Sequence, residues 1–106
     1  MFGLGVKVPA ITAKDLVEQL KQDCPPVVID VRTLAEFRTG HISGAHLIPL
    51  SELARRLDEI PKDRPVVTVC RSGSRSQIAA KQLIKKGYDV CNLVGGMVRW
   101  SGKTVR

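Results

Sequence analysis

One short loop of the sequence gathers the residue types best suited to covalent chemistry. Cys70 follows the apolar run 66–69 and precedes a helix-patterned segment from about residue 75 to about 86. A turn from a strand into a helix directs several backbone N–H groups and the positive end of the helix dipole toward one point. Arg71 and Arg75 add positive charge nearby. We therefore expect a lowered pKa for the Cys70 thiol and a reactive thiolate at neutral pH.

The other residues of this loop are small and polar. Gly73 lets the chain curl without a Cβ clash, while Ser72, Ser74 and Ser76 add hydroxyl donors around the sulfur. The alternative is a free cysteine that merely ends a core strand, because cysteine is among the most frequently buried residues. That alternative gives the polar and basic neighbours no role, so the loop composition favours a functional thiol.

The length and composition indicate one globular domain. A chain of 106 residues, 43% of them hydrophobic, can build one core but not two, and we expect that core to span about residues 8–100 of a single domain. Three cysteines without metal-ligand spacing argue against a disulfide scaffold or a metal centre and indicate a reducing compartment. Residues 1–5 show no basic-then-apolar leader, and no apolar run has membrane-spanning length. The expected location is the cytoplasm.

The net charge of +7 raises the question of nucleic-acid binding. The lysines and arginines, however, are distributed over every predicted helix and loop and form no single basic stripe. We therefore expect no nucleic-acid or membrane partner. Solvated faces account for most of the charge, and the positive potential is also expected to attract small anions.

Strand and helix patterns alternate along the chain. Thr12 and Ser51 are expected to cap helices that end near residues 23 and 60, and Glu52 is spaced to pair with Arg56. Residues 33–38 are expected to form one or two helical turns before Gly40, 41–45 a polar loop, and 97–100 a short final helix. The expected strands are 8–11, 27–32, 46–48, 66–69 and 89–94.

This alternation predicts an α/β fold with an open, mainly parallel sheet and helices on both faces. In such sheets the ligand crevice lies at the carboxyl ends of the strands. Arg32 and the Gly95-Gly96 turn also follow strand ends, so we expect them to rim the same crevice as Cys70.

Five short motifs then follow one another at characteristic spacings. They are Asp30-Val31-Arg32, Glu36-Phe37 with the stretch 40–45, Ile48-Pro49, the loop 70–76, and Gly95-Gly96-Met97 with Trp100. From about residue 8 to 100 the chain resembles the small single-domain sulfurtransferases of the rhodanese family. Only six residues follow Trp100, so we expect the last helix to be poorly anchored.

The resemblance implies a ping-pong sulfurtransferase that needs no cofactor. The Cys70 thiolate would take the sulfane sulfur of a small anionic donor such as thiosulfate, hold it as a persulfide, and pass it to a thiol or cyanide. Backbone N–H groups of residues 71–75 would stabilise the anionic persulfide. A sulfur-relay protein is a further possible partner.

Several charged residues near the loop have two interpretations each. Arg71 either attracts the anionic donor or points into solvent. Arg75 either touches the substrate or braces the loop through a bidentate pair with Asp30 or Glu36, and we favour bracing. Asp30 and Arg32 are expected to support the structure and not to react.

The remaining candidates are expected to serve packing. A thiolate of low pKa needs no general base, so His41 and His46 are interpreted as packing and hydrogen-bonding residues. Met97 and Trp100 are expected to close the core. Cys24 and Cys91 are interpreted as incidental or buried thiols, and a resolving role for either is the less favoured alternative.

Two other function classes compete with sulfur transfer. Phosphatases and arsenate reductases with a cysteine loop resemble a pattern of Cys, five residues and Arg, whereas here four residues separate Cys70 from Arg75 and Ser76 stands where the arginine would be. A sulfur carrier or regulatory binding module would use the same loop without efficient turnover. We expect such a carrier to be slow with small acceptors and fast with one protein.

Overall fold

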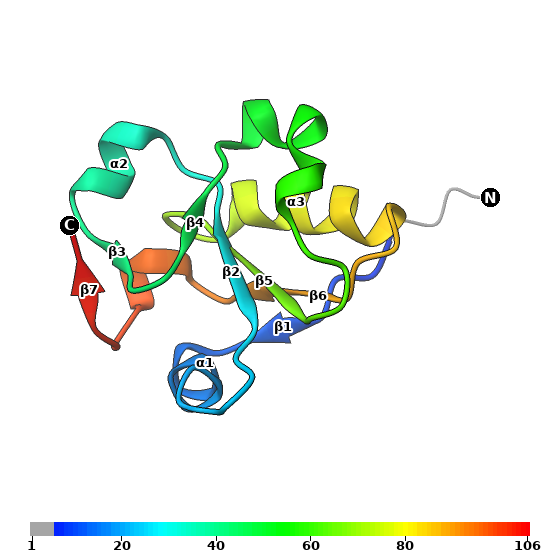
Figure 1. The fold of residues 1–106 in the computed structure, drawn as a ribbon. Helices are drawn as coiled ribbons and strands as arrows, with labels where there is room; N and C mark the ends of the chain where they lie inside the picture. The colour runs from blue at the N-terminus through cyan, green and yellow to red at the C-terminus, as the bar shows by residue number, and fades with distance from the viewer. Residues whose placement is uncertain (1–5) are drawn as a thin grey trace.

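The computed structural model describes residues 6–106, so the expectation about a leader in residues 1–5 lies outside the described part. Its centre is a parallel five-stranded sheet with the order β1-β6-β5-β2-β4. The strands are β1 (Ala10–Ile11), β2 (Val27–Asp30), β4 (His46–Leu47), β5 (Val66–Val69) and β6 (Val90–Leu93). The expected α/β fold class is confirmed (Figure 1).

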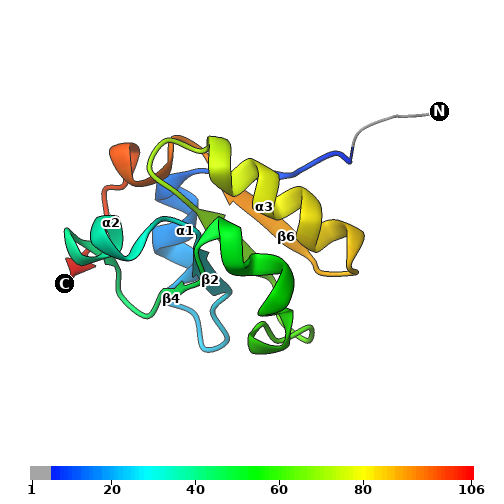
Figure 2. The same cartoon turned by 90° about the horizontal axis from the view of Figure 1, so that it is seen from above.

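Helices cover both faces of this sheet, and alternate strand residues point toward each of them. Val66 packs in the cluster that holds Leu83 of α3 (Ser74–Lys85), whereas Val67 packs in the cluster that holds Leu16 of α1 (Ala13–Gln19). Figures 1 and 2 show α3 and α1 on opposite sides of the strands. The sheet is therefore buried on both faces, which agrees with the continuous apolar runs of β2 and β5.

The two long helices begin and end close to where the sequence indicates. Thr12 caps α1 by accepting a hydrogen bond from the Asp15 N–H at 3.1 Å, as expected. This helix ends at Gln19, earlier than the expected end near residue 23, because the N–H groups of Lys21 and Gln22 bond three residues back. After α3, Gly87 has the left-handed φ of 92° that was expected of it.

The predicted single helix over residues 51–60 is wrong. The structure has two short 3₁₀ helices, η1 (Leu50–Arg55) and η2 (Leu57–Glu59), and Ser51 caps neither of them. Arg56, with φ of −121°, separates the two, and its side chain makes the expected ion pair with Glu52 at 2.8 Å. Apolar residues three and four apart fit a 3₁₀ turn as well as an α-helical one, so the sequence pattern did not distinguish them.

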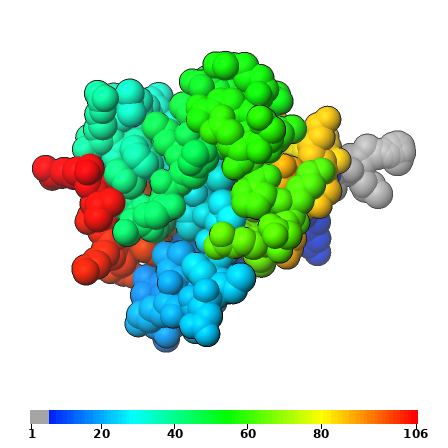
Figure 3. Space-filling view, viewed as in Figure 1, coloured from blue at the N-terminus to red at the C-terminus, as the bar shows by residue number. Residues whose placement is uncertain are grey.

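The C-terminal tail corrects a second expectation. β3 (His41–Ile42), which was expected to be part of a polar loop, pairs antiparallel with β7 (Thr104–Val105). This pairing anchors the tail that follows η3 (Gly96–Arg99), contrary to the expectation of poor anchoring. The Trp100 indole N–H also donates to the Lys103 carbonyl at 3.1 Å. Figure 3 shows the tail against the segment that carries α2 (Leu34–Arg38) and β3.

Within residues 6–106, no helix combines the length and the apolar composition that crossing a membrane requires.

Candidate active site

Cys70 lies where β5 ends and the chain turns into α3. Val31 donates its N–H to the Val69 carbonyl, so the paired backbone continues up to the residue before the cysteine. Gly73, with a left-handed φ of 111°, then turns the chain so that α3 begins at Ser74. Cys70 is only 1% exposed, because the loop folds over it. This is the strand-end position that the sequence indicated.

The Cys70 sulfur accepts two hydrogen bonds from its own loop. The Gly73 N–H donates at 3.0 Å and the Ser76 hydroxyl at 3.2 Å. Burial raises the pKa of the Cys70 thiol, but the hydroxyl of Ser76 and the N–H groups of Ser76, Gly73 and Ser72 outweigh burial and lower the pKa overall. A lowered pKa was expected; the hydroxyl and backbone donors are its largest causes, and the charge of Arg75 also interacts with the Cys70 thiolate.

Asn92 of β6 contributes to the same hydrogen-bond network. Its side-chain N–H donates to the Gly73 carbonyl at 3.2 Å and to the Gln77 side chain at 3.0 Å. The Gly73 carbonyl also accepts the Gln77 N–H at 3.1 Å. The Ser76 hydroxyl has one proton and two acceptors in reach, this carbonyl and the sulfur. Because Asn92 and Gln77 already donate hydrogen bonds to the Gly73 carbonyl, the Ser76 hydroxyl can donate its proton to the Cys70 sulfur.

The sequence analysis did not single out Asn92. The only signal was a polar residue inside a buried, otherwise apolar strand, and that signal does not say which group it faces. Only the neighbouring position of β6 beside β5 and α3 brings Asn92 to the loop.

Arg75 forms a bidentate ion pair with Glu36, with N–O distances of 2.7 and 2.8 Å. Glu36 also completes a capping box with Thr33 at the start of α2. The Arg75 hydrogen bond, helped by Thr33 and opposed by desolvation, lowers the pKa of Glu36 from 4.5 to about 2. The geometry agrees with the bracing interpretation of Arg75, with Glu36 and not Asp30 as its partner.

Asp30 and Arg32 form a second pair that is nearly inaccessible to solvent. The Arg32 Nη2 lies 2.8 Å from Asp30 Oδ2, and the two side chains are 5% and 1% exposed. The same Nη2 donates to the Gly40 carbonyl at 2.9 Å. This pair therefore ties the end of β2 to the loop between α2 and β3, which agrees with the structural role expected for both residues.

A hollow of about 460 Å³ opens beside the cysteine loop. Its walls are Arg32, Glu36, Thr39, Gly40, Arg71, Met97, Val98 and Thr104. The Met97 and Val98 N–H groups donate to the Cys70 and Arg71 carbonyls at 2.9 and 3.0 Å, which holds η3 against the loop. Arg32 and the Gly95-Gly96 turn thus lie beside the loop as expected. Met97 lines this hollow as well as packing against the core.

The histidines contact other parts of the molecule. His41 stacks on the Phe37 ring with centroids 3.5 Å apart, and its Nδ1 lies 2.9 Å from the Phe37 carbonyl. His46 Nε2 lies 2.8 Å from a Glu59 carboxylate oxygen. Both sets of contacts agree with packing and hydrogen-bonding roles.

The other two cysteines differ from Cys70 in their surroundings. Cys24 is exposed, and Cys91 is partly buried within β6. Burial, and then the charge of Asp89, raise the pKa of Cys91. No group of three or more potential metal ligands occurs in the described residues.

Known proteins resemble this chain in sequence and in structure. The sequence pattern of the rhodanese-like domain matches residues 12–103. A sulfurtransferase from Allochromatium vinosum is 40% identical over 95 residues, which are 89% of each chain. The thiosulfate sulfurtransferase GlpE of Shewanella oneidensis is 39% identical over 69% of this chain and 73% of its own.

Other relatives are longer, and solved structures share the fold. YrkF of Bacillus subtilis, named as a candidate sulfur carrier, is 35% identical over 92% of this chain, but the chain spans about half (53%) of YrkF. The crystal structure of a rhodanese-like domain protein from Staphylococcus aureus superposes with a TM-score of 0.85 at 32% identity, covering 91% of this chain and 94% of that one. The chain therefore belongs to the family of rhodanese-like domains.

Proposed function

We propose that this protein is a sulfurtransferase whose Cys70 carries sulfur as a persulfide between a small anionic donor and a thiophilic acceptor. Relatives named as sulfurtransferases support a sulfur-transfer role. The observation that carries the mechanism is the Cys70 sulfur at the strand end, held by the Gly73 N–H and the Ser76 hydroxyl with a lowered pKa.

In the first half-reaction the Cys70 thiolate attacks the outer sulfur of thiosulfate. A new S–S bond forms, the S–S bond of thiosulfate breaks, and sulfite leaves with the bonding electron pair. Cys70 is 1% exposed, so only a narrow part of the donor molecule can reach its sulfur. Loop N–H groups of residues 71–75 stabilise the negative charge of the resulting persulfide.

In the second half-reaction a thiolate or cyanide attacks the terminal sulfur of the persulfide. The bond to Cys70 breaks, and its electron pair restores the Cys70 thiolate. No cofactor or metal enters either step. No oxidant or reductant is needed, because the transferred sulfur keeps its oxidation state.

The first experiment is intact mass spectrometry after incubation with thiosulfate, followed by a cyanide chase. We expect the protein to gain one sulfur, about 32 Da, and to lose it to cyanide. Cys70→Ser should take up none, and Cys91→Ser, which removes a thiol of raised pKa, should load like the wild type. Loading of the Cys70→Ser variant would contradict the proposal.

Arg71 is proposed to attract the anionic donor, because its side chain is exposed and lines the hollow beside the loop. Arg71→Ala should raise the thiosulfate concentration needed for half-maximal loading by roughly tenfold. An uncharged persulfide donor should be affected far less, and Lys85→Ala, which removes an exposed charge at the far end of α3, is the matched control. Equal effects on both donors would refute the steering role.

A sulfur carrier that serves one protein partner is the second candidate. Val98, whose N–H donates to the Arg71 carbonyl of the loop, is a large apolar side chain that is 65% exposed, and such a side chain suits contact with a protein. Single-turnover transfer from the loaded protein to small thiols distinguishes the two candidates. Rapid transfer to small thiols or cyanide favours the enzyme, and transfer to one protein alone favours the carrier.

The phosphatase or arsenate reductase alternative receives less support. An oxyanion clamp needs a free bidentate arginine, but the guanidinium of Arg75 is occupied by Glu36. Hydrolysis of an aryl phosphate by the wild type, lost in Cys70→Ser, would restore this alternative.

The cytoplasmic location stays a prediction.

A further inference from the structure

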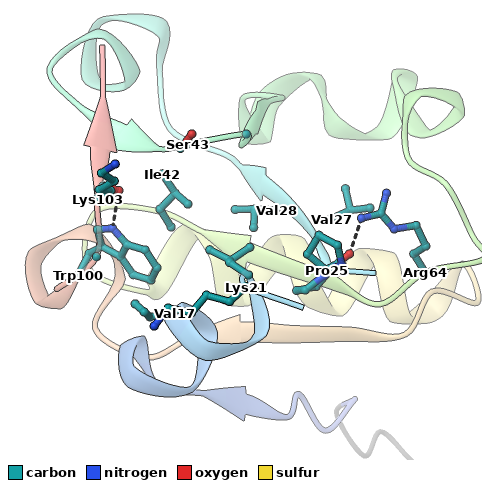
Figure 4. A pocket seen from close by; sticks show the side chains of 14 residues that line it. Val17, Lys21, Pro25, Val27, Val28, Ile42, Ser43, Arg64, Trp100 and Lys103 are labelled. Carbon is teal, nitrogen blue, oxygen red and sulfur yellow. Dashed lines mark hydrogen bonds between the residues drawn. The ribbon is translucent and has the colours of Figure 1, made fainter. Parts of the chain in front are cut away.

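A second hollow lies away from the cysteine loop. It has a volume of about 520 Å³ and lies between α1, the start of β2, β3 and the C-terminal tail (Figure 4). Its walls are Val17, Leu20, Lys21, Pro25, Pro26, Val27, Val28, Ile42, Ser43, Gly44, Arg64, Trp100, Gly102 and Lys103. None of these residues lines the hollow beside Cys70, so nothing in the proposed sulfur chemistry uses this groove.

The walls of the groove have the composition of a small-molecule site. Valine, leucine, isoleucine, proline and tryptophan side chains form most of its surface. Binding sites for small ligands usually have volumes of about 300–1,000 Å³, with apolar walls and a few polar groups. The volume of the groove falls within that range, and all of its charged lining residues are cations.

Three lining residues are cations and none is an acid. Lys21 is compensated by Glu18, whose carboxylate lies 3.2 Å from its Nζ. Arg64 and Lys103 form no ion pair with another residue of the described part of the chain. The groove therefore combines apolar walls with positive charge that an anionic ligand can neutralise.

Arg64 is the better placed of these two cations. Its side chain is partly buried, and one Nη donates to the Pro25 carbonyl, which fixes the guanidinium before any ligand binds. Lys103 is exposed and flexible by nature, so it pays more side-chain entropy to hold a ligand. Figure 4 shows Arg64 and Pro25 at one end of the groove, Trp100 and Lys103 at the other, and Val28 and Ile42 between them.

We propose that this groove binds a small carboxylate with an apolar chain. The carboxylate pairs with Arg64, and the chain lies over Val28 and Ile42 toward the Trp100 ring. This assignment is independent of the sulfurtransferase proposal, so the Cys70→Ser variant should bind the same ligand equally well.

Trp100 makes the proposal directly measurable, because it is the only tryptophan of the chain. We expect octanoate to change its fluorescence in a saturable way. Octanol, which has the same chain but no charge, should bind about tenfold more weakly, the loss expected for one charge-assisted hydrogen-bonded pair. Isothermal titration calorimetry gives the same comparison without the fluorophore.

Variants identify the group that holds the carboxylate. Arg64→Met should weaken octanoate binding by about tenfold and leave octanol binding unchanged. Arg64→Lys should restore part of the affinity, and Lys103→Met should have a smaller effect. Lys85→Met removes the same charge at an exposed position outside the groove and should bind like the wild type. Circular dichroism verifies that each variant is folded.

Three outcomes would overturn the proposal. They are the absence of saturable octanoate binding to the wild type, equal affinity for octanol and octanoate, and equal behaviour of folded Arg64→Met and Lys85→Met. Binding of acidic peptides in preference to octanoate would assign the groove to a protein partner and would also refute the small-molecule proposal.

Discussion

Cys70 follows β5 and Cys91 lies in the neighbouring strand β6, yet their surroundings have opposite effects on the pKa of the thiol. Cys91 pairs with Val67 in the middle of β6, where the ladder uses its backbone and burial raises the pKa of its side chain. Cys70 directly follows β5, where the turn into α3 supplies unpaired N–H groups that lower the pKa of its thiol. Even though Cys70 is the more buried of the two, the pKa of its thiol is lowered and that of Cys91 is raised.

The comparison shows that burial alone does not decide whether a cysteine is reactive. A strand interior has no free donors, because each N–H already bonds a neighbouring strand. A strand end followed by a helix has several donors without partners.

The closest packing behind the cysteine loop is at Gly96. A Cβ at this position would lie against the backbone oxygens of Cys70 and Arg71, and its φ of +55° is left-handed. Gly96→Ala should therefore displace the loop, lower the free energy of unfolding by about 3 kcal/mol and remove most sulfur loading.

Gly87→Ala is the matched control for Gly96→Ala. Gly87 is also left-handed, with φ of +92°, but nothing lies within 4 Å of its added Cβ. It should cost about 1 kcal/mol of stability and leave loading intact. Thermal denaturation and the mass assay test both variants, and equal loss of loading would contradict the role of Gly96.

Ser76 supplies the hydroxyl donor to the Cys70 sulfur. Ser76→Ala should raise the pKa of the Cys70 thiol and lower the loading rate at neutral pH by about tenfold, because a hydrogen bond to a charged group is lost. The rate should recover as the pH rises and the thiolate reforms. Ultraviolet absorbance of the thiolate, in a background without Cys24 and Cys91, measures the shift, and an unchanged pH profile would refute the assignment.

Glu36 braces the loop from the outside, so its effect should be the smallest. Because the pKa of Glu36 falls from 4.5 to about 2 on folding, its stabilisation is present above about pH 4.5 and is lost as the pH falls toward about 2. Glu36→Gln should cost about 1 kcal/mol at neutral pH, since the pair is partly exposed.

The control for Glu36→Gln is Glu18→Gln, which breaks an ion pair whose side chains are both 65% exposed and should cost almost nothing. Urea denaturation between about pH 2 and 7 compares the two variants. If Glu36→Gln keeps the full acid dependence of the wild type, another group is responsible for it.

The candidate site illustrates how far sequence reasoning reached. It predicted a reactive Cys70, a turn at Gly73 and a bracing role for Arg75, and the geometry agrees with all three, because each depends on residues close in sequence or on a strand end. It placed both arginines among the causes of the lowered pKa, whereas the hydroxyl and backbone donors are the larger causes and, of the two arginines, Arg75 interacts with the thiolate through its charge. It did not identify Asn92, because the contact of this β6 residue with Gly73 joins segments that are distant in sequence.

The sequence by itself determined the parallel sheet, its central strands and the position of the cysteine at a strand end, since apolar periodicity and turn residues are local properties. Only the tertiary structure decided the pairing of β3 with β7, because two-residue strands far apart in the chain leave no periodic pattern. It alone also decided the 3₁₀ form of η1 and η2 and the groove between α1 and the tail. Those features depend on how surfaces from distant segments pack, and the order of residues does not record that packing.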